Sequence, residues 1–205
     1  MTIKWDIERE WDGLTVLIIG AGPDVTGDMI DAVVRDKTVA VNRAIRYAPN
    51  ADMFVALDPH HPFWEAAESF PGIKVCGIET DDYPDARYAG MFYENVALGD
   101  NHTVSLRNNA LAAIRIVECM GAKRIVLLGF DPERYEEVHA HTGFYGLTEG
   151  LKQMIVELRG KGIEIERIDS PVQHPGKPRE RRGDALPAPV EHINPTTFPV
   201  RKRKT

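Results

Sequence analysis

The stretch "LTVLIIGAGPDV", residues 14–25, decides the fold class of this chain. Its apolar run is typical of a strand that is buried on both faces of a sheet. A Gly20-Ala21-Gly22 turn follows, and the spacing of apolar residues over positions 24–36 then predicts a helix. A strand, a glycine-rich turn and a helix in this order are typical of the first unit of a dinucleotide-binding fold.

The details of the turn argue against a nicotinamide or flavin dehydrogenase. The dinucleotide fingerprint requires a third glycine where this chain has Val25, and an acid at the end of the second strand where it has Asn42. Glycines still allow backbone N–H groups to approach an anion, and the positive end of the following helix favours one. Two alternatives stay open: a phosphate-binding loop stiffened by Pro23, or a tight turn without a ligand.

Strands and helices alternate along residues 14–170. The alternation predicts βαβ units and a Rossmann-like α/β fold, with a mostly parallel sheet and helices on both faces. After the strand at 14–20, further strands are expected at 38–42, 51–58, 73–79, 123–131 and 163–169, with a weaker pattern at 91–98. Helices are expected at 24–36, 43–50, 62–70, 108–122 and 148–162. The apolar stripe of the first helix consists of Met29, Ile30, Val33 and Val34.

Length and composition indicate one globular domain with a segment on either side. A chain of 205 residues, 43% of them hydrophobic, is long enough for one buried core. We expect a helical or extended lead-in at 1–13, the nucleotide-binding domain at 14–170 and a proline-rich basic tail at 171–205. No run is apolar enough for a membrane span or a signal peptide, and Cys76 and Cys119 lie in apolar segments typical of buried thiols. These features predict a cytoplasmic protein.

The charge is unevenly spread along the chain. From position 169 onward there are eight basic and four acidic residues, so this end carries +4 and the rest −10, within a net charge of −6. An acidic body argues against a broad nucleic-acid-binding face. The basic tail is either a solvated extension or a contact surface for an acidic partner, and homo-oligomerisation stays open.

Polar residues follow most of the expected strands, where open α/β sheets bind their ligands. Asn42 suits a ribose or a base edge, and its alternative role is the N-cap of the next helix. Asp58 either orients a metal or a ligand hydroxyl, or caps the next turn. The adjacent His60 and His61 are weak evidence for a metal site, so no metal ligands are assigned.

Two histidines and an aspartate follow the strand expected at 123–131. If the loop around His139 and His141 is extended, both side chains point the same way. Either is suited to act as general base toward an acceptor hydroxyl, because the pKa of histidine lies near neutrality. Asp131 holds such a histidine or Mg²⁺, or it caps the next turn. The alternative for the histidines is a pair of exposed loop residues.

Four segments together resemble a superfamily that contains the archaeal-type 6-hydroxymethylpterin diphosphokinases and the bacterial sialyltransferases of glycosyltransferase family 42. They are "IIGAGPDV" (18–25), "AVNRAI" (40–45), "ADMFVALDP" (51–59) and "NNALAAIRIVECMGAKRIVLLGFD" (108–131). The later "VHAHTG" (138–143) is similar to a His-Ala-x-Gly element of the pterin branch, with one added residue. The resemblance covers residues 14–146, and short phage-encoded relatives are similar to this chain in size.

The resemblance implies a transferase that uses a nucleotide-activated donor and a hydroxyl acceptor. Mg²⁺ is an optional cofactor of such a transferase. His141 or His139 would remove the acceptor proton. Glycosyl transfer from a nucleotide sugar is favoured over pyrophosphoryl transfer from ATP, because no lysine-rich triphosphate cradle is visible. An ATP-dependent diphosphokinase of the pterin type and a non-catalytic nucleotide-binding or scaffold protein are the alternatives. Gly20, Ala21, Gly22 and Pro23 would hold the donor phosphates with their backbone amides. Asn42 and Asp58 would position the nucleoside or the acceptor.

Two departures separate the chain from the pattern of this superfamily. The serine that usually follows Gly-Pro is Asp24, which places a negative charge near any bound phosphate. The small Ser-Gly or Gly-Ser pair at the start of the long helix is replaced by Asn109 and Ala110. Ser105 is the nearest substitute for the lost hydroxyl, so Ser105 and Asn109 complete the set of candidate ligand-binding residues.

Overall fold

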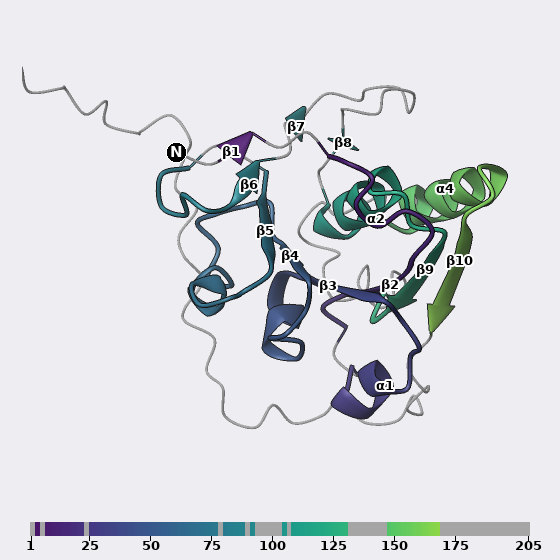
Figure 1. The fold of residues 1–205 in the computed structure, drawn as a ribbon, viewed down its shortest axis with the longest axis horizontal. Coiled ribbons are helices and arrows are strands. Elements are labelled where there is room, and N and C mark those ends of the chain that lie inside the picture. The colour runs from purple at the N-terminus through teal and green to yellow at the C-terminus, as the bar shows by residue number, and fades with distance from the viewer. Residues whose placement is uncertain are drawn as a thin grey trace, which may run out of the picture. The chain divides into compact units, whose positions relative to one another are not determined.

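The computed structural model is an α/β fold built on a parallel sheet (Figure 1). The structure describes residues 3–4, 7–22, 25–77, 80–88, 91–92, 104–105, 108–130 and 147–168.

Six strands form a parallel sheet in the order β5-β4-β3-β2-β9-β10. They are β2 (Thr15–Ile19), β3 (Lys37–Val41), β4 (Met53–Val55), β5 (Ile73–Cys76), β9 (Arg124–Leu128) and β10 (Glu164–Ile168). Two short strands, β6 (Arg87–Tyr88) and β1 (Ile3–Lys4), extend the sheet beyond β5, again in parallel. The expectation of a Rossmann-like parallel sheet is therefore confirmed.

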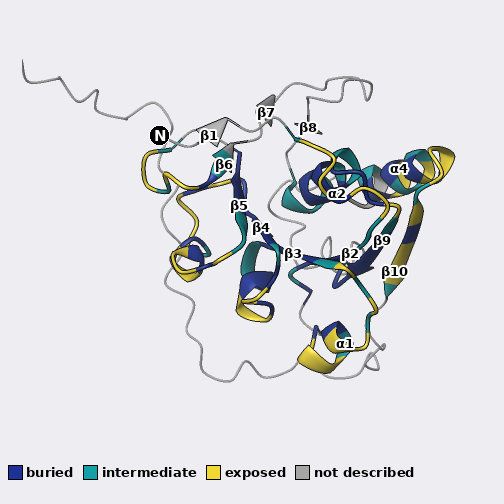
Figure 2. Cartoon of the chain, viewed as in Figure 1, coloured by how far each residue is buried: buried dark blue, intermediate teal, exposed yellow. Residues whose placement is uncertain are grey.

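Alternate residues of each central strand face opposite sides of the sheet, and each side has its own core. On one face, residues such as Val16, Val39 and Ile125 pack in a cluster with α2 (Asn109–Cys119) and α4 (Leu147–Gly160). On the other face, residues such as Leu17 and Phe54 pack in a second cluster with three short helices. These are α1 (Gly27–Asp31) and the 3₁₀ helices η1 (Asn42–Arg46) and η2 (Glu65–Ala67). Figure 2 shows the buried residues concentrated in the central strands.

The two faces of the sheet are covered by different parts of the chain. β2 to β5 succeed one another toward one edge, and the elements that connect them cover one face. β9 and β10 extend toward the other edge, and α2 and α4 cover the opposite face. A reversal of direction with right-handed connections requires this change of face.

The first expected helix is much shorter than residues 24–36. α1 begins after Thr26, whose hydroxyl accepts a hydrogen bond from the N–H of Met29, and it spans five residues. Arg35 donates hydrogen bonds to the carbonyls of Ile30 and Val33, which ends the helix there. The inclusion of Val34 in the buried stripe is wrong, because this side chain is 86% exposed.

Other expected elements differ in length or kind. The helix at 62–70 is reduced to the three-residue η2, although Trp64 and Phe70 at its flanks are buried. Within 91–98 the structure describes only β7 (Met91–Phe92), which pairs with β8 (Val104–Ser105) in a separate two-stranded sheet. The strands β1 and β6 were not expected, because two-residue strands leave no periodic pattern.

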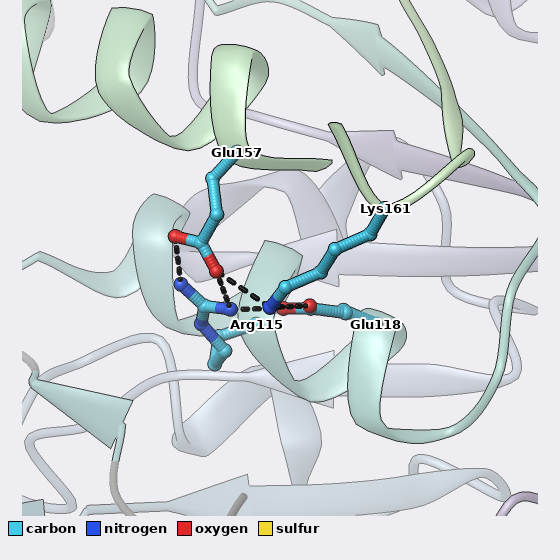
Figure 3. Close-up of polar contacts among 4 residues, drawn as sticks. All are labelled: Arg115, Glu118, Glu157 and Lys161. Atoms are coloured by element: carbon cyan, nitrogen blue, oxygen red, sulfur yellow. Dashed lines mark hydrogen bonds and ion pairs between the residues drawn. The ribbon is translucent and has the colours of Figure 1, made fainter. Parts of the chain in front are cut away.

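The helical layer is joined by an ion-pair network between α2 and α4 (Figure 3). Arg115 donates from Nη1 and Nη2 to the two carboxylate oxygens of Glu157, at 2.9 Å each, and it also pairs with Glu118. Lys161 bridges Glu118 at 2.7 Å and Glu157 at 2.6 Å. The hydrogen bonds from Arg115 hold the pKa of Glu157 at about 2, well below its ordinary value.

The C-terminal end of α2 is closed by the segment that precedes β2. Trp11 is buried, and its backbone N–H donates to the carbonyl of Met120. The backbone N–H of Gly13 donates to the carbonyl of Gly121. Gly121 has φ +92°, as expected of the glycine that ends this helix. Cys76 is buried as expected, whereas Cys119 is only half-buried. In the described part of the chain, no helix is both long and apolar enough to cross a membrane.

Candidate functional site

The topological switch point of the sheet lies between β2 and β9. In the sheet, β2 lies between two strands. On one side is β3, the next strand in the chain, and on the other side is β9, which comes much later in the chain. In open α/β sheets, ligands bind beyond the carboxyl ends of the strands at such a point. The loop at Gly20-Ala21-Gly22 and the loop at Gly129 begin here.

At the switch point these two loops are in direct backbone contact. The N–H of Gly20 donates to the carbonyl of Leu128 at 2.8 Å, and the N–H of Gly22 donates to that of Gly129 at 3.2 Å. A Cβ atom at Gly20 would lie 2.6 Å from the carbonyl oxygen of Gly129. The glycines therefore serve close packing, and the N–H groups of Gly20 and Gly22 are bonded within the protein rather than directed at a ligand.

The contact between the loops after β2 and β9 also explains why the chain has Val25 at the position of the third glycine in the dinucleotide fingerprint. Val25 is buried, and a Cβ at Gly129 would lie 2.5 Å from its Cγ2 atom. Gly129 has φ +74°, so glycine suits its backbone as well as the space available. In a dinucleotide-binding fold, the third glycine allows the helix to pack closely on the strand. Here the close contact is instead allowed by Gly129, the glycine that follows β9.

The helix that follows the loop is a poor source of electrostatic attraction for an anion. α1 has five residues and begins five positions after Gly22, with its first turn capped by Thr26. A short, capped helix contributes little macrodipole. The attraction that α1 adds for an anion at this loop is therefore small, and Pro23 and Asp24 lie outside the described residues.

Asn42 directly follows β3 and has φ +54°, the left-handed conformation. The N-cap position of η1 is Val41, so the alternative role of Asn42 as the N-cap is wrong. The side chain of Asn42 is half-buried and makes no hydrogen bond to the described residues. Strained backbone with an unused polar side chain at the carboxyl end of a strand is typical of a ligand site.

Arg43 was not recognised as a functional candidate from the sequence. Its Nε and Nη2 atoms donate to the carbonyl oxygen of Ala21 at 3.1 and 2.8 Å, which ties η1 to the loop after β2. The residue is half-buried, and among the described residues no carboxylate lies within ion-pair distance of it. A basic residue directly after a strand end was the signal available in the sequence.

The loop after β4 is ordered by Asp58. Its Oδ1 atom accepts from the N–H of His60 at 3.0 Å, so the capping alternative is observed. Nδ1 of His60 lies 3.8 Å from Oδ2 of Asp82. The ring of His61 stacks on the ring of Phe63, with centroids 4.0 Å apart. All three polar residues of this loop, Asp58, His60 and His61, are exposed.

Asn109 lies at the start of α2 and connects this helix to the same edge of the sheet. Its Oδ1 atom accepts from the N–H of Leu57 at 2.9 Å, beyond the end of β4. The N-terminal turn is capped by Asn108, which accepts from Ala110 and Leu111. The side chain of Asn109 therefore links α2 to the loop after β4, and Ser105 lies in β8, where its side chain is not described.

The three predicted catalytic residues lie outside the part of the chain that the structure describes. They are Asp131, His139 and His141, so the general base and its partner stay predictions. Among the residues that the structure covers, no group of three or more His, Cys, Asp or Glu side chains is arranged to hold a metal ion. An open groove of about 510 Å³ lies by β10, between Arg124, Arg159 and Glu166, at the far end of the strands from the switch point.

No protein-family model matches this chain, and no curated protein matches it. The six-stranded parallel α/β sheet is the part of the superfamily resemblance that the structure shows.

Proposed function

We propose that this protein binds a nucleotide at the carboxyl ends of β2 and β3 and acts as a nucleotide-dependent transferase. The observation that carries the proposal is Arg43. Its guanidinium is half-buried and held in place by the carbonyl of Ala21, without a carboxylate partner among the described residues. The Nη1 atom makes no hydrogen bond within that set and suits a phosphate oxygen.

Asn42 supports a nucleotide rather than a simple phosphate. It directly precedes Arg43, and its amide can both donate and accept a hydrogen bond. A ribose hydroxyl or a base edge needs such a partner within a few ångströms of the phosphate site. The two residues therefore provide complementary contacts for one ligand.

The transfer step is proposed for a nucleotide sugar and a hydroxyl acceptor. His141 or His139 takes the proton of the acceptor hydroxyl, and the acceptor oxygen forms a bond to the anomeric carbon. The bond between that carbon and the donor phosphate oxygen breaks, and the nucleotide leaves with its electron pair. An ATP-dependent diphosphokinase is the alternative in which a phosphorus atom is attacked, with Mg²⁺ on the phosphates.

A non-catalytic nucleotide-binding protein is a second candidate. One observation favours it: the N–H groups of Gly20 and Gly22 are bonded within the protein. A catalytic loop would commonly direct such groups at the phosphates. His141→Ala and His139→Ala separate the two candidates, because loss of turnover with retained binding supports the transferase, and unchanged function supports the non-catalytic protein.

Isothermal titration of the full chain with nucleotides and nucleotide sugars tests the binding proposal. We expect Arg43→Ala to weaken binding at least about tenfold, since hydrogen bonds to charged groups contribute roughly 1.5–3 kcal/mol. Arg46→Ala is the matched control, because Arg46 lies in the same 3₁₀ helix and is exposed. Arg43→Lys keeps the charge and should fall between the two.

Three results would overturn the proposal in different ways. If the folded parent chain binds none of these compounds, it has no nucleotide site. If Arg43→Ala and Arg46→Ala bind equally well, Arg43 is not part of the site. If NAD alone binds tightly, the rejection of a dehydrogenase is wrong.

A further inference from the structure

The loop that follows β4 holds its aromatic residues in fixed positions. The carbonyl of Asp58 accepts from the N–H of His61 at 3.2 Å, and the carbonyl of His61 accepts from the N–H of Trp64 at 3.0 Å. Trp64 is fully buried, and its ring meets the ring of Phe54 edge to face, with centroids 5.2 Å apart. The backbone of His61 is thus anchored to the core although its side chain is exposed.

The imidazole of His61 is itself oriented by Phe63. The two rings are stacked, with an interplanar angle of 28° and centroids 4.0 Å apart. The N–H of Phe63 also donates to Nδ1 of His61 at 3.4 Å, so both contacts with Phe63 fix the orientation of the ring. One face of the imidazole is covered by Phe63, and His61 as a whole is exposed.

This loop lies at the same edge of the sheet as Asn42 and Arg43. β3 and β4 are neighbours, and their register pairs Val41 with Val55, so the residues that follow both strands emerge side by side. η1 and η2 also contact each other on this face. Neighbouring parallel strands are only about 4.8 Å apart. The guanidinium of Arg43 lies at the loop after β2, which is two strand spacings, or about 10 Å, from β4, and a nucleoside diphosphate with its terminal phosphate at Arg43 is long enough to reach the loop after β4.

The loops after β2 and β9 are in close backbone contact at the switch point. The N–H of Gly22 donates to the carbonyl of Gly129, and a Cβ at Gly22 would lie 2.8 Å from the Cα of Gly129. We therefore place the base of a nucleotide bound at Arg43 on the side of β4 rather than of β9.

We propose that His61 is the stacking platform for the base of the bound nucleotide, and that the site prefers a purine. The inference rests on the proposed nucleotide site at Arg43. A ring that is already stacked on one face and fixed in orientation loses little conformational freedom when a second ring covers its other face. Histidine is among the side chains on which bases stack, and a purine offers the larger ring surface.

The test compares ADP, UDP and inorganic pyrophosphate by isothermal titration on the full chain. We expect ADP to bind more tightly than UDP, and His61→Ala to weaken ADP about tenfold and to remove the ADP–UDP difference. Pyrophosphate binding should stay unchanged in this variant. His61→Phe should restore ADP binding, because it keeps a ring, and His60→Ala is the matched control from the same loop.

The contrary results separate a failure of stacking from a failure of the nucleotide site. If ADP binds and Arg43→Ala weakens it while His61→Ala does not, the stacking proposal is overturned and the nucleotide site stands. If His61→Ala weakens ADP and pyrophosphate alike and His61→Phe restores neither, His61 acts through the loop, and the proposal is again overturned. If the parent chain binds neither nucleotide, the proposed function fails, and this inference fails with it.

Discussion

Two arginines of this protein show how differently its helical layer and the carboxyl edge of its sheet are built. Arg115 lies between α2 and α4, is 12% exposed, and pairs with both Glu118 and Glu157. Arg43 lies at the end of β3 and donates to a single carbonyl oxygen, with no carboxylate within reach among the described residues. The first guanidinium completes a structural network, whereas the second retains capacity for a ligand.

The same contrast holds for asparagine and for glycine. Asn108 caps α2 with its side chain, whereas Asn42 has strained backbone and an amide without a partner among the described residues. Gly162, after α4, has a positive φ with open space around it, whereas Gly129 has a positive φ in tight contact. The helical layer is satisfied by its own residues, and the sheet edge combines tight packing with unused polar groups. That combination is what we expect of a preorganised binding site.

The largest expected effect concerns the glycine contact at the switch point. Gly129→Ala places a Cβ 2.5 Å from Val25 in a left-handed backbone, so we expect a loss of about 3 kcal/mol in the free energy of unfolding. Gly162→Ala is the matched control, because it has φ +80° but no atom within 4 Å of the new Cβ. It should lose only about 1 kcal/mol. Urea denaturation measures both, and equal losses would refute the steric role of Gly129.

Gly129 also shows which features of the fold can be predicted from the sequence and which cannot. The buried strands were predicted because a continuous apolar run such as residues 14–19, placed before a glycine-rich turn and a helix, is typical of a central strand in a βαβ unit. The exchange of roles between Val25 and Gly129 was not predicted. These residues are more than a hundred positions apart, and their contact depends on the pairing of β2 with β9.

The lengths of short helices and strands could not be predicted from the sequence either. Five residues of α1 carry too little periodicity to define where a helix ends, and the termination depends on hydrogen bonds from Arg35. For the candidate site, Asn42 was selected because it follows a strand, which is a topological rule, and its role in binding stays a prediction. The role of Arg43 was missed because its contact with Ala21 crosses between two loops. Local pattern therefore predicts which residues stand at the edge, and tertiary contacts decide which of them are left unpaired.

An intermediate effect is expected in the helical layer. Glu157→Gln removes a charge that pairs with the largely buried Arg115, so we expect a loss of about 2 kcal/mol in the free energy of unfolding at pH 7. Because the pKa of Glu157 is about 2 in the folded chain and 4.5 ordinarily, its contribution is complete above pH 4.5. It is lost as the pH falls through this range toward 2.

The measurement is therefore the unfolding free energy of the parent and of Glu157→Gln at several pH values. The difference between the two proteins should narrow as the pH falls from 5 toward 2.5. Glu166→Gln is the control, since its pair with Arg124 is exposed and contributes less than about 1 kcal/mol. A gap that stays constant with pH would show that packing, rather than charge, accounts for the loss.

The smallest effect on stability, and the sharpest test of the comparison, concerns Asn42. Glycine accepts φ +54° without strain but gains freedom in the unfolded chain, and the two effects oppose each other. We therefore expect Asn42→Gly to change the free energy of unfolding by less than about 1 kcal/mol, while nucleotide binding weakens severalfold through the lost amide. Urea denaturation and isothermal titration on the same preparation separate the two quantities. If stability falls and binding is retained, Asn42 belongs with Asn108 among the structural residues, and the contrast between the two regions fails at this position.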